Sequence, residues 1–169
     1  MSPIGRVRVL HVCTIALTAH AFIAPLAKYL HNRGYEVAIA CSTGAQPDAP
    51  DDLRCREVSG ARMYHVPIAR TVSPVQDVVA IVKLWGLIRR LRPHIVHTQT
   101  SKAGVVGRLA ACLAGTPIVI HTAHAFPFHS HLPPAVRLCC VVIERWMARL
   151  TDLIIVDTER VRSDGLREH

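Results

Sequence analysis

LRPHIVHTQTSKAGVVGRLAACLAGTPIVIHTAHAFPFH, residues 91–129, is the stretch of the chain that decides its fold. Two segments in it, His94–Gln99 and Pro117–His121, are short and rich in Val and Ile, as β-strands are. Between them, Lys102–Ala114 has the apolar spacing of a helix, and Gly115 follows where a helix commonly ends. Strand, helix and strand in this order predict two parallel strands joined by a crossover helix.

The same alternation continues on both sides of this stretch. Further strands are expected at Val7–Cys13, Glu36–Cys41, Arg62–Val66 and Asp152–Val156, and further helices at Ala19–Arg33, Val75–Arg92 and Pro133–Leu150. Prolines, aspartates and weak periodicity in Thr43–Ser59 indicate a surface excursion with a short helix. The chain is therefore predicted to be α/β, with helices on both faces of a parallel sheet. The last three strands have unbroken apolar runs, so we expect them at the centre of the sheet.

Length and composition fit a single domain. The chain has 169 residues, half of them apolar, which is enough to bury a sizeable core. The formal charge of +8 favours anionic partners such as phosphate groups, anionic lipids or nucleic acid. No nucleic-acid-binding motif accompanies that charge, so we expect no nucleic acid partner. No run of apolar residues is long enough to predict a helix that spans a bilayer.

Cysteine usage and the N-terminal residues bear on the cellular compartment. The six cysteines show no paired metal spacing, and most lie in apolar patterns, which indicates buried thiols in a reducing cytosol. Arg6 and Arg8 before the apolar run Val9–Leu17 resemble the start of a signal peptide. His11 and Thr14 interrupt that run, which favours a first strand instead.

Three loops follow strand ends, where parallel sheets bind their ligands: Thr14–His20, Thr98–Lys102 and Thr122–His131. In the second loop, Thr100 or Ser101 is expected to cap a helix that carries Lys102 in its first turn. The helix N-terminus, the hydroxyl groups and the lysine could bind one phosphate group together. The alternative is ordinary capping, with Gly104 and Gly107 serving close packing of the helix on the sheet.

The third loop holds the densest group of functional-looking residues, from His121 to His131. His124 would be held at the ligand edge, where an imidazole can exchange a proton or bond to a sugar hydroxyl. His121 is expected to be buried and bonded to backbone, and His129 and His131 to be plain loop residues. A zinc site of these histidines is disfavoured, because no acidic or cysteine partner stands at a recognised metal spacing. We therefore expect no metal.

The helix expected at Pro133–Leu150 carries Arg137, Arg145 and Arg149 near one face, with Trp146 beside them. Arginines next to an aromatic side chain on a helix can rest on an anionic membrane surface. The other interpretation, and the favoured one, is a basic solvated face over an apolar buried one.

As a whole the chain resembles the N-terminal domain of the family 4 glycosyltransferases, particularly bacterial members that build polysaccharides on lipid carriers. The resemblance rests on RVLHVCT at 8–14, AKYLHNRGYEVAIACS at 27–42, SPVQDV at 73–78, residues 91–129 and TDLIIVDTE at 151–159. It implies the GT-B architecture, in which two Rossmann-like domains face each other across a cleft. The first domain holds the acceptor and the second holds most of the nucleotide sugar, and no metal is normally required.

The resemblance also implies roles for particular residues. His124 corresponds to the active-site histidine that contacts the transferred sugar or the acceptor. Thr14 and its loop would approach the donor diphosphate. Residues on the acceptor and phosphate side would be Thr100, Ser101, Lys102 and Phe126. The implied reaction is hexosyl transfer with retention, from a nucleotide sugar as co-substrate to a saccharide acceptor on a lipid carrier.

Three departures from the family pattern stand out. Ala125 occupies a position where the family usually has glycine, and the loop Ile15–His20 lacks the glycines that many members use against the diphosphate. The sequence given ends at His169, so the donor-binding domain is expected to be absent from it. We therefore expect residues 1–169 to be the acceptor-binding half of a cytoplasmic enzyme at the inner face of the membrane. It would be a fragment, or one subunit working with a separate donor-binding chain. The alternatives are a nucleotide-sugar epimerase-like domain and a non-catalytic membrane-surface module.

Overall fold

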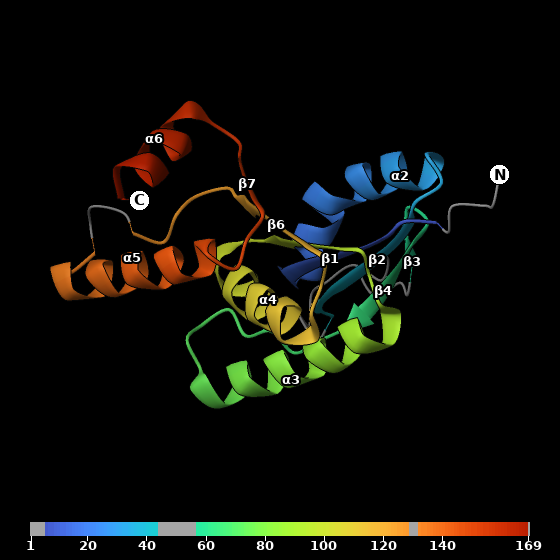
Figure 1. The fold of residues 1–169 in the computed structure, drawn as a ribbon, viewed down its shortest axis with the longest axis horizontal. Helices are drawn as coiled ribbons and strands as arrows, with labels where there is room; N and C mark the ends of the chain where they lie inside the picture. Colours follow the sequence, from blue (N-terminus) through green and yellow to red (C-terminus); the bar gives the residue numbers. More distant parts are fainter. Residues whose placement is uncertain (1–5, 44–56, 129–131, 169) are drawn as a thin grey trace.

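The computed structural model describes residues 6–43, 57–128 and 132–168. These residues form one seven-stranded sheet with the order β3-β4-β2-β1-β5-β6-β7 (Figure 1). The strands are β1 (Arg8–Ile15), β2 (Glu36–Ser42), β3 (Glu57–Val58), β4 (Ala61–His65), β5 (Ile95–Gln99), β6 (Ile118–Ala123) and β7 (Leu153–Val156). All neighbouring pairs are parallel except β3 and β4, which form a short antiparallel hairpin. Residues 44–56 of the excursion expected at 43–59, including Cys55 and most of its expected short helix, lie outside the described residues, as do His129 and His131. Its last residues form β3 and the start of the turn to β4 instead of a helix.

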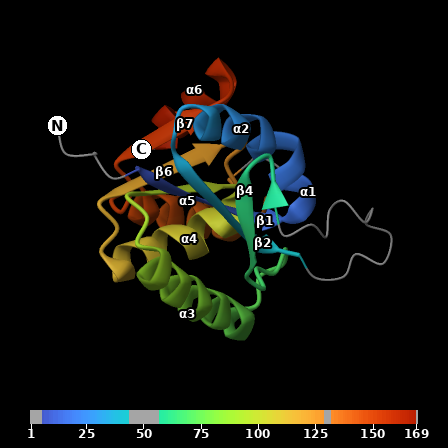
Figure 2. The ribbon, with the colours of Figure 1, turned by 90° about the vertical axis from the view of Figure 1, so that its right-hand side faces the viewer.

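Helices cover both faces of this sheet, as the sequence predicted (Figures 1 and 2). They are α1 (Ala16–Thr18), the π-helix η1 (Ala19–Ile23), α2 (Ala24–Asn32), α3 (Pro74–Leu91), α4 (Ser101–Ala114), α5 (Pro134–Ala148) and α6 (Glu159–Glu168). Leu10 and Val12 of β1 pack with α3 and α4 in one core cluster. Cys13 of the same strand belongs to a second cluster with η1 and α2. Alternate side chains of one strand therefore serve the two layers.

The single helix expected at Ala19–Arg33 is divided into two segments, η1 and α2, and the short helix α1 precedes them. A π-helical turn spans Ala19–Ile23, and the N–H of Ala24 donates to the carbonyl of Ala19, five residues back. Pro25 comes next, and a proline has no N–H with which to continue an α-helical ladder. The regular α-helix therefore resumes only after this turn. π-helical turns are frequent at functional sites.

The expectation that the strand at 152–156 is central is wrong. β7 pairs only with β6 and forms an edge of the described sheet, where Leu153 and Ile155 remain 51% and 39% exposed. An apolar run indicates surface that needs covering, but it does not say whether a second strand lies beside it. β1, β5 and β2 take the central positions instead.

Two further expectations about burial need correction. Cys13 and Cys41 are buried as predicted, but Cys112 and Cys139 are exposed on α4 and α5. The expected basic outer face of α5 is confirmed only in part, because Arg145 and Arg149 are exposed but so are Leu138, Val142 and Trp146. The inward face of α5 instead buries the charged Glu144. The reason is a partner: Glu144 forms a buried ion pair with Arg108 of α4, at 2.8 Å.

Candidate functional site

Four parallel strands bring their carboxyl ends to one edge of the sheet. β1 ends beside Thr14, β5 at Gln99 and Thr100, β6 before His124 and β7 before Asp157. Because parallel strands run in the same direction, residues that are far apart in the sequence meet at this edge. The structure thus brings three of the predicted residues, Thr14, Thr100 and His124, to the expected place.

His124 is held on three sides at this edge. Its Nδ1 bonds to the carboxylate of Asp157, and its Nε2 lies 3.4 Å from Oε1 of Gln99. The ring of Phe22, from the π-helical turn, lies 5.0 Å away between centroids, with the two planes tilted by 42°. The His124 side chain is 28% exposed, so it stays accessible from solution.

The pair with Asp157 fixes the chemistry of the imidazole. An ionised carboxylate only accepts hydrogen bonds, so Nδ1 of His124 carries the proton that it donates to Asp157. In the neutral ring, Nε2 is then an acceptor for a sugar hydroxyl, and it can bond to Gln99 only through that residue's amide N–H, with the carboxamide turned over. In the protonated ring Nε2 is a donor, either to Oε1 of Gln99 or to a phosphate or carboxylate oxygen. Asp157 therefore fixes the orientation of the His124 ring before any ligand binds.

A second pair lies at the ends of β1 and β5. The hydroxyl oxygens of Thr14 and Thr100 are 2.7 Å apart, which joins the two strand ends by a hydrogen bond. Thr100 has φ 66° and ψ 150°, a backbone conformation that residues other than glycine rarely adopt and that costs about 1–3 kcal/mol. Such strain is concentrated at functional sites. It turns the chain sharply from β5 into α4.

The start of α4 differs in part from the prediction. Thr100 occupies the N-cap position, but its side chain does not cap the helix because it bonds to Thr14 instead. Ser101 begins the helix, as the first-turn residue. Lys102 forms an ion pair with Asp77 of α3, so its ammonium group is directed to a neighbouring helix. The structure therefore does not group Lys102 with His124.

Phe126 follows His124 in the same loop and packs against α6. Its ring stacks on Phe128 at 4.8 Å between centroids, and Gly165 of α6 lies directly against it. A side chain at Gly165 would approach within 2.7 Å of the Phe126 ring. The two phenylalanines line a cavity of about 440 Å³ together with Arg137, Arg160 and Arg167, among other residues. Ala125, in the position of the family glycine, is exposed and has no positive φ, so the loop tolerates its methyl group here.

Three histidines of the neighbouring strands, His11, His97 and His121, are buried. His121 is 2% exposed, and its Nδ1 bonds to the hydroxyl of Thr98 at 2.9 Å. Its predicted burial is confirmed, but its partner is a threonine hydroxyl instead of backbone. Burial lowers the pKa of His121 to about 3, that of His97 to about 4 and that of His11 to about 3. These rings are neutral at physiological pH and serve the core.

Sequence reasoning missed three members of the site: Asp157, Gln99 and Phe22. Asp157 directly follows the last strand, so it could have been found by the same strand-end argument that selected His124. Gln99 was assigned to its strand without a role. Phe22 could not be placed, because its approach to His124 depends on the π-helical turn. Within the described part of the chain, no group of three or more His, Cys, Asp or Glu side chains could hold a metal ion.

The fold is that of a Rossmann-like α/β domain, and polar side chains cluster at the carboxyl edge of its sheet. The model of one family, the glycosyl transferase 4-like domain, matches residues 18–168, and the chain belongs to this family. The predicted resemblance to the N-terminal domain of family 4 glycosyltransferases is thereby confirmed.

Two enzymes illustrate the sequence similarity. The chain is 30% identical over 155 residues to the UDP-Gal:alpha-D-GlcNAc-diphosphoundecaprenol alpha-1,3-galactosyltransferase of Escherichia coli, covering 89% of this chain and 38% of that enzyme. It is 24% identical over 115 residues to the capsular polysaccharide biosynthesis glycosyltransferase CapM of Staphylococcus aureus, covering 68% and 28%. The chain spans about two fifths or less of the length of such curated relatives.

Solved structures share the fold at low sequence identity. MurG of Acinetobacter baumannii superposes with a TM-score of 0.63 at 14% identity, covering 92% of this chain and 42% of MurG. The UDP-N-acetylglucosamine 2-epimerase of Neisseria meningitidis superposes with a TM-score of 0.66 at 17% identity, covering 95% and 43%. Transferases and epimerases thus share this architecture, and the fold alone does not separate them.

Proposed function

We propose that this chain supplies the acceptor-binding half of a retaining glycosyltransferase, which moves a hexosyl group from a nucleotide sugar to a lipid-linked saccharide. Family membership supports the transferase, and the names of relatives that act on diphosphoundecaprenol-linked substrates support the acceptor class. An epimerase is disfavoured, because epimerases resemble this chain in fold at 17% identity or less, whereas the sequence relatives are transferases.

The observation that carries the proposal is the His124–Asp157 pair at the carboxyl edge, beside the joined Thr14 and Thr100. With Nδ1 bonded to Asp157, Nε2 of His124 offers one oriented contact, to a sugar hydroxyl or, in the protonated ring, to a phosphate oxygen. Thr14 and Thr100 offer hydroxyl groups on the adjacent strand ends, where Thr14 is the residue assigned to the donor diphosphate. Phe126 and Phe128 offer apolar surface on the acceptor side.

One wall of a cleft can bind a substrate, but it does not place groups on all sides of the transition state. Catalysis requires groups that hold both reactants and that stabilise the charge which develops between them. Further contacts to the donor phosphates and the leaving group would come from outside residues 1–169, because these residues span only about two fifths of the length of the relatives that they match. We therefore expect residues 1–169 to bind acceptor but to transfer little sugar alone.

The test is a transfer assay with radiolabelled nucleotide sugars and a short-chain lipid diphosphate saccharide. The chain is assayed alone and together with a polypeptide that carries the donor-binding half, such as the product of a neighbouring gene. Transfer that requires both polypeptides supports the proposal. Full transfer by the chain alone, or none with either combination across the nucleotide sugars, contradicts it.

Within the two-polypeptide assay, His124→Ala is compared with His65→Ala. A lost hydrogen bond to a charged group costs about 1.5–3 kcal/mol, which corresponds to roughly 10–100-fold in rate. His65 is an exposed histidine at the end of β4, bonded to Thr43, and serves as the matched control. Equal losses in the two variants would argue against a role for His124.

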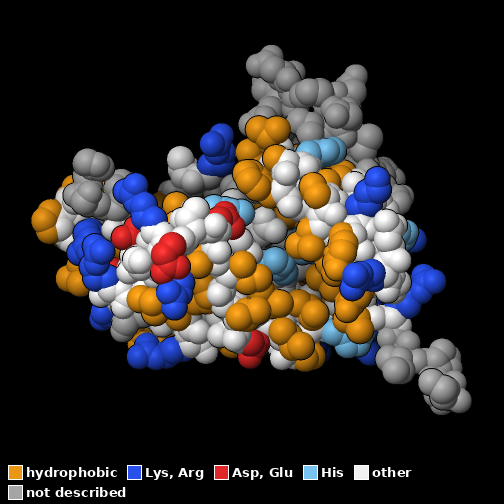
Figure 3. Space-filling view, turned by 90° about the horizontal axis from the view of Figure 1, so that it is seen from above, with side chains coloured by type: hydrophobic (Ala, Val, Ile, Leu, Met, Phe, Trp, Pro, Cys, Tyr) orange, Lys and Arg blue, Asp and Glu red, His pale blue; other side chains and the backbone are white. Residues whose placement is uncertain are grey.

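We also propose that the enzyme contacts the inner face of the membrane through α5. The described residues contain no helix that is long and apolar enough to cross a membrane. On α5, Leu138, Val142 and Trp146 are 63%, 44% and 61% exposed along one stripe. The guanidinium of Arg149 lies 5.0 Å from the Trp146 ring. Figure 3 shows Arg side chains, interspersed with Asp and Glu, over the end of the molecule where α5 and α6 lie. Apolar and basic side chains together favour an anionic lipid surface.

The membrane contact is tested by flotation with anionic vesicles at low and high salt. Leu138→Glu with Trp146→Glu removes two exposed apolar side chains from α5. Val75→Glu with Val82→Glu makes the same charge change on α3, where these valines are 77% and 58% exposed. Loss of flotation with the α5 pair alone supports the proposal. Loss with the α3 pair alone, or no flotation of the unchanged chain, contradicts it.

A further inference from the structure

A cavity of about 250 Å³ lies at the edge of the sheet opposite to His124. Its floor is formed by the first residues of two neighbouring strands, Val9 and Leu10 of β1 and Val37 and Ala38 of β2. β1 runs for eight residues from this edge to the other, a distance of roughly 25 Å. A small ligand in this cavity therefore cannot touch the site at the carboxyl edge.

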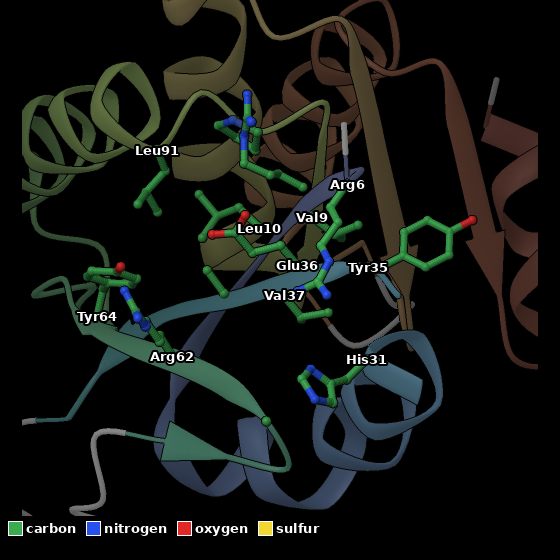
Figure 4. A pocket seen from close by; sticks show the side chains of 14 residues that line it. Arg6, Val9, Leu10, His31, Tyr35, Glu36, Val37, Arg62, Tyr64 and Leu91 are labelled. Carbon is green, nitrogen blue, oxygen red and sulfur yellow. The ribbon is translucent and has the colours of Figure 1, made fainter. Parts of the chain in front are cut away.

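The charges around the cavity are unbalanced. The guanidinium groups of Arg6, Arg8 and Arg62 line it, whereas Glu36 is the one carboxylate among its lining residues. Figure 4 shows Arg6 and His31 extending toward the same space from the start of β1 and the end of α2. Arg62 lies across from them beside Tyr64. Three cations against one anion favour a negatively charged ligand.

Two of the wall residues are held in place by the fold. Arg8 donates from Nε and Nη2 to the carbonyl of Arg92, at 2.9 and 2.8 Å. The ring of His31 packs against Gly60, where a Cβ atom would lie 2.9 Å from the ring. Gly60 has φ +82°, so the turn between β3 and β4 both requires glycine and presses on the histidine. The cavity wall is therefore a fixed part of the fold.

Arg6 and Arg62, the other two arginines that line the cavity, are not held by a partner among the described residues. Over residues 6–43, 57–128 and 132–168, the Arg6 and Arg62 side chains form no ion pair or hydrogen bond, and Glu36 forms no ion pair. Arginine forks match the oxygen geometry of phosphate groups and bind them through paired N–H donors. We propose that this cavity binds the phosphate group of a small soluble metabolite, at a site separate from the one described above.

The size of the cavity limits the ligand. One water molecule occupies about 30 Å³ of liquid, so a volume of about 250 Å³ corresponds to roughly eight waters. Pockets for drug-sized ligands are typically about 300–1,000 Å³. Inorganic phosphate or a compact phosphate monoester fits, with Tyr35 and Tyr64 available to contact its organic part. A whole nucleotide sugar would not be enclosed.

Calorimetric titration of the chain with inorganic phosphate, at neutral pH and constant ionic strength, tests the proposal. Arg6→Gln and Arg62→Gln are each expected to weaken phosphate binding at least about tenfold, because a charge-assisted hydrogen bond is lost. Arg33→Gln removes the same charge outside the cavity, where Arg33 lies over the Tyr29 ring, and is expected to leave binding unchanged. Glu36→Gln removes the opposing carboxylate and is expected to tighten binding.

The proposal is overturned if phosphate binds no better than chloride. It is also overturned if Arg33→Gln weakens binding as much as the cavity variants, since attraction would then follow net charge alone. Vesicles that carry phosphatidic acid distinguish a lipid headgroup from a soluble phosphate. A loss of vesicle binding in Arg6→Gln without any loss of free phosphate binding would overturn the soluble ligand.

Discussion

His121 and His124 stand three residues apart at the end of β6, yet they occupy two different regions of the molecule. His121 points under α4, where it is 2% exposed and bonds to the hydroxyl of Thr98. His124 lies past the end of the strand, partly open to solution, with a carboxylate at one ring nitrogen and a carboxamide near the other. The same type of side chain serves packing in one place and, in the proposed function, recognition in the other.

The difference is one of surroundings. Under α4, burial removes water and lowers the pKa of His121, so the ring stays neutral and inert. At the carboxyl edge, Asp157 stabilises one orientation of the His124 ring while leaving Nε2 within reach of a ligand. Depth below the surface therefore decides which histidine can act. The following predictions change the buried region first and the edge afterwards.

The largest effect is expected at the ion pair that supports the buried region. Arg108 bonds to Glu144 and to the carbonyl of Gly104, and it is fully buried. Glu144→Gln or Arg108→Met leaves the other partner as a buried, unpaired charge, which typically costs about 3–5 kcal/mol of unfolding free energy. Urea denaturation measures the loss. The exposed pair Arg162–Glu159 is the control, and breaking it should cost less than about 1 kcal/mol. A similar small loss at both pairs would contradict a supporting role for Arg108.

Close packing against His121 gives the next effect. A Cβ atom at Gly104 would lie 2.6 Å from Cε1 of His121, a ring that Thr98 holds in place. Gly104→Ala is expected to destabilise the fold by about 1–2 kcal/mol, because overpacking outweighs the gain in helix propensity. Gly86→Ala on α3 meets open space and should stabilise by about 0.5–1 kcal/mol. Opposite signs in thermal melts are predicted, and stabilisation by both changes would show that the packing around His121 is loose.

The buried histidines should make stability depend on pH. The folded-state pKa of His121, about 3, lies below the ordinary value of 6.5, so the unfolded chain binds more protons between these values. The contribution to stability is fully present above pH 6.5 and is lost as the pH falls toward 3. Its slope is at most about 1.4 kcal/mol per pH unit for each such histidine. His121→Gln should flatten the fall in unfolding free energy between pH 6.5 and 5. An unchanged slope would argue that His121 is not buried.

The smallest effect on stability is expected at the carboxyl edge. Asp157 is 47% exposed, so Asp157→Asn should change the unfolding free energy by less than about 1 kcal/mol. The same change should weaken acceptor binding several-fold, because the His124 ring loses the carboxylate that orients it. Fluorescence titration with a lipid diphosphate saccharide measures this effect. If acceptor binding is unaltered, Asp157 has no role in binding at this site.

Some features of the two histidine regions could be predicted from the sequence, and others could not. The strand and helix order followed from apolar periodicity, and strand-end position selected His124, Thr14 and Thr100. The exposed position of β7 could not be predicted, because the apolar run of a strand does not reveal its neighbours. The inward turn of Glu144 depends on Arg108, 36 residues away, and the ammonium of Lys102 depends on Asp77 in another helix. In each of these cases the sequence does not show which distant elements lie next to each other.

Histidine-selective NMR measures the central claim most directly. The chain is labelled at its imidazole rings, and the signals of His121 and His124 are assigned by replacing each in turn. During titration with a short-chain lipid diphosphate saccharide, the ring signals of His124 should shift and saturate while those of His121 stay in place. Absence of saturable binding, or binding that leaves His124 unmoved, would contradict the account of this edge as the acceptor site.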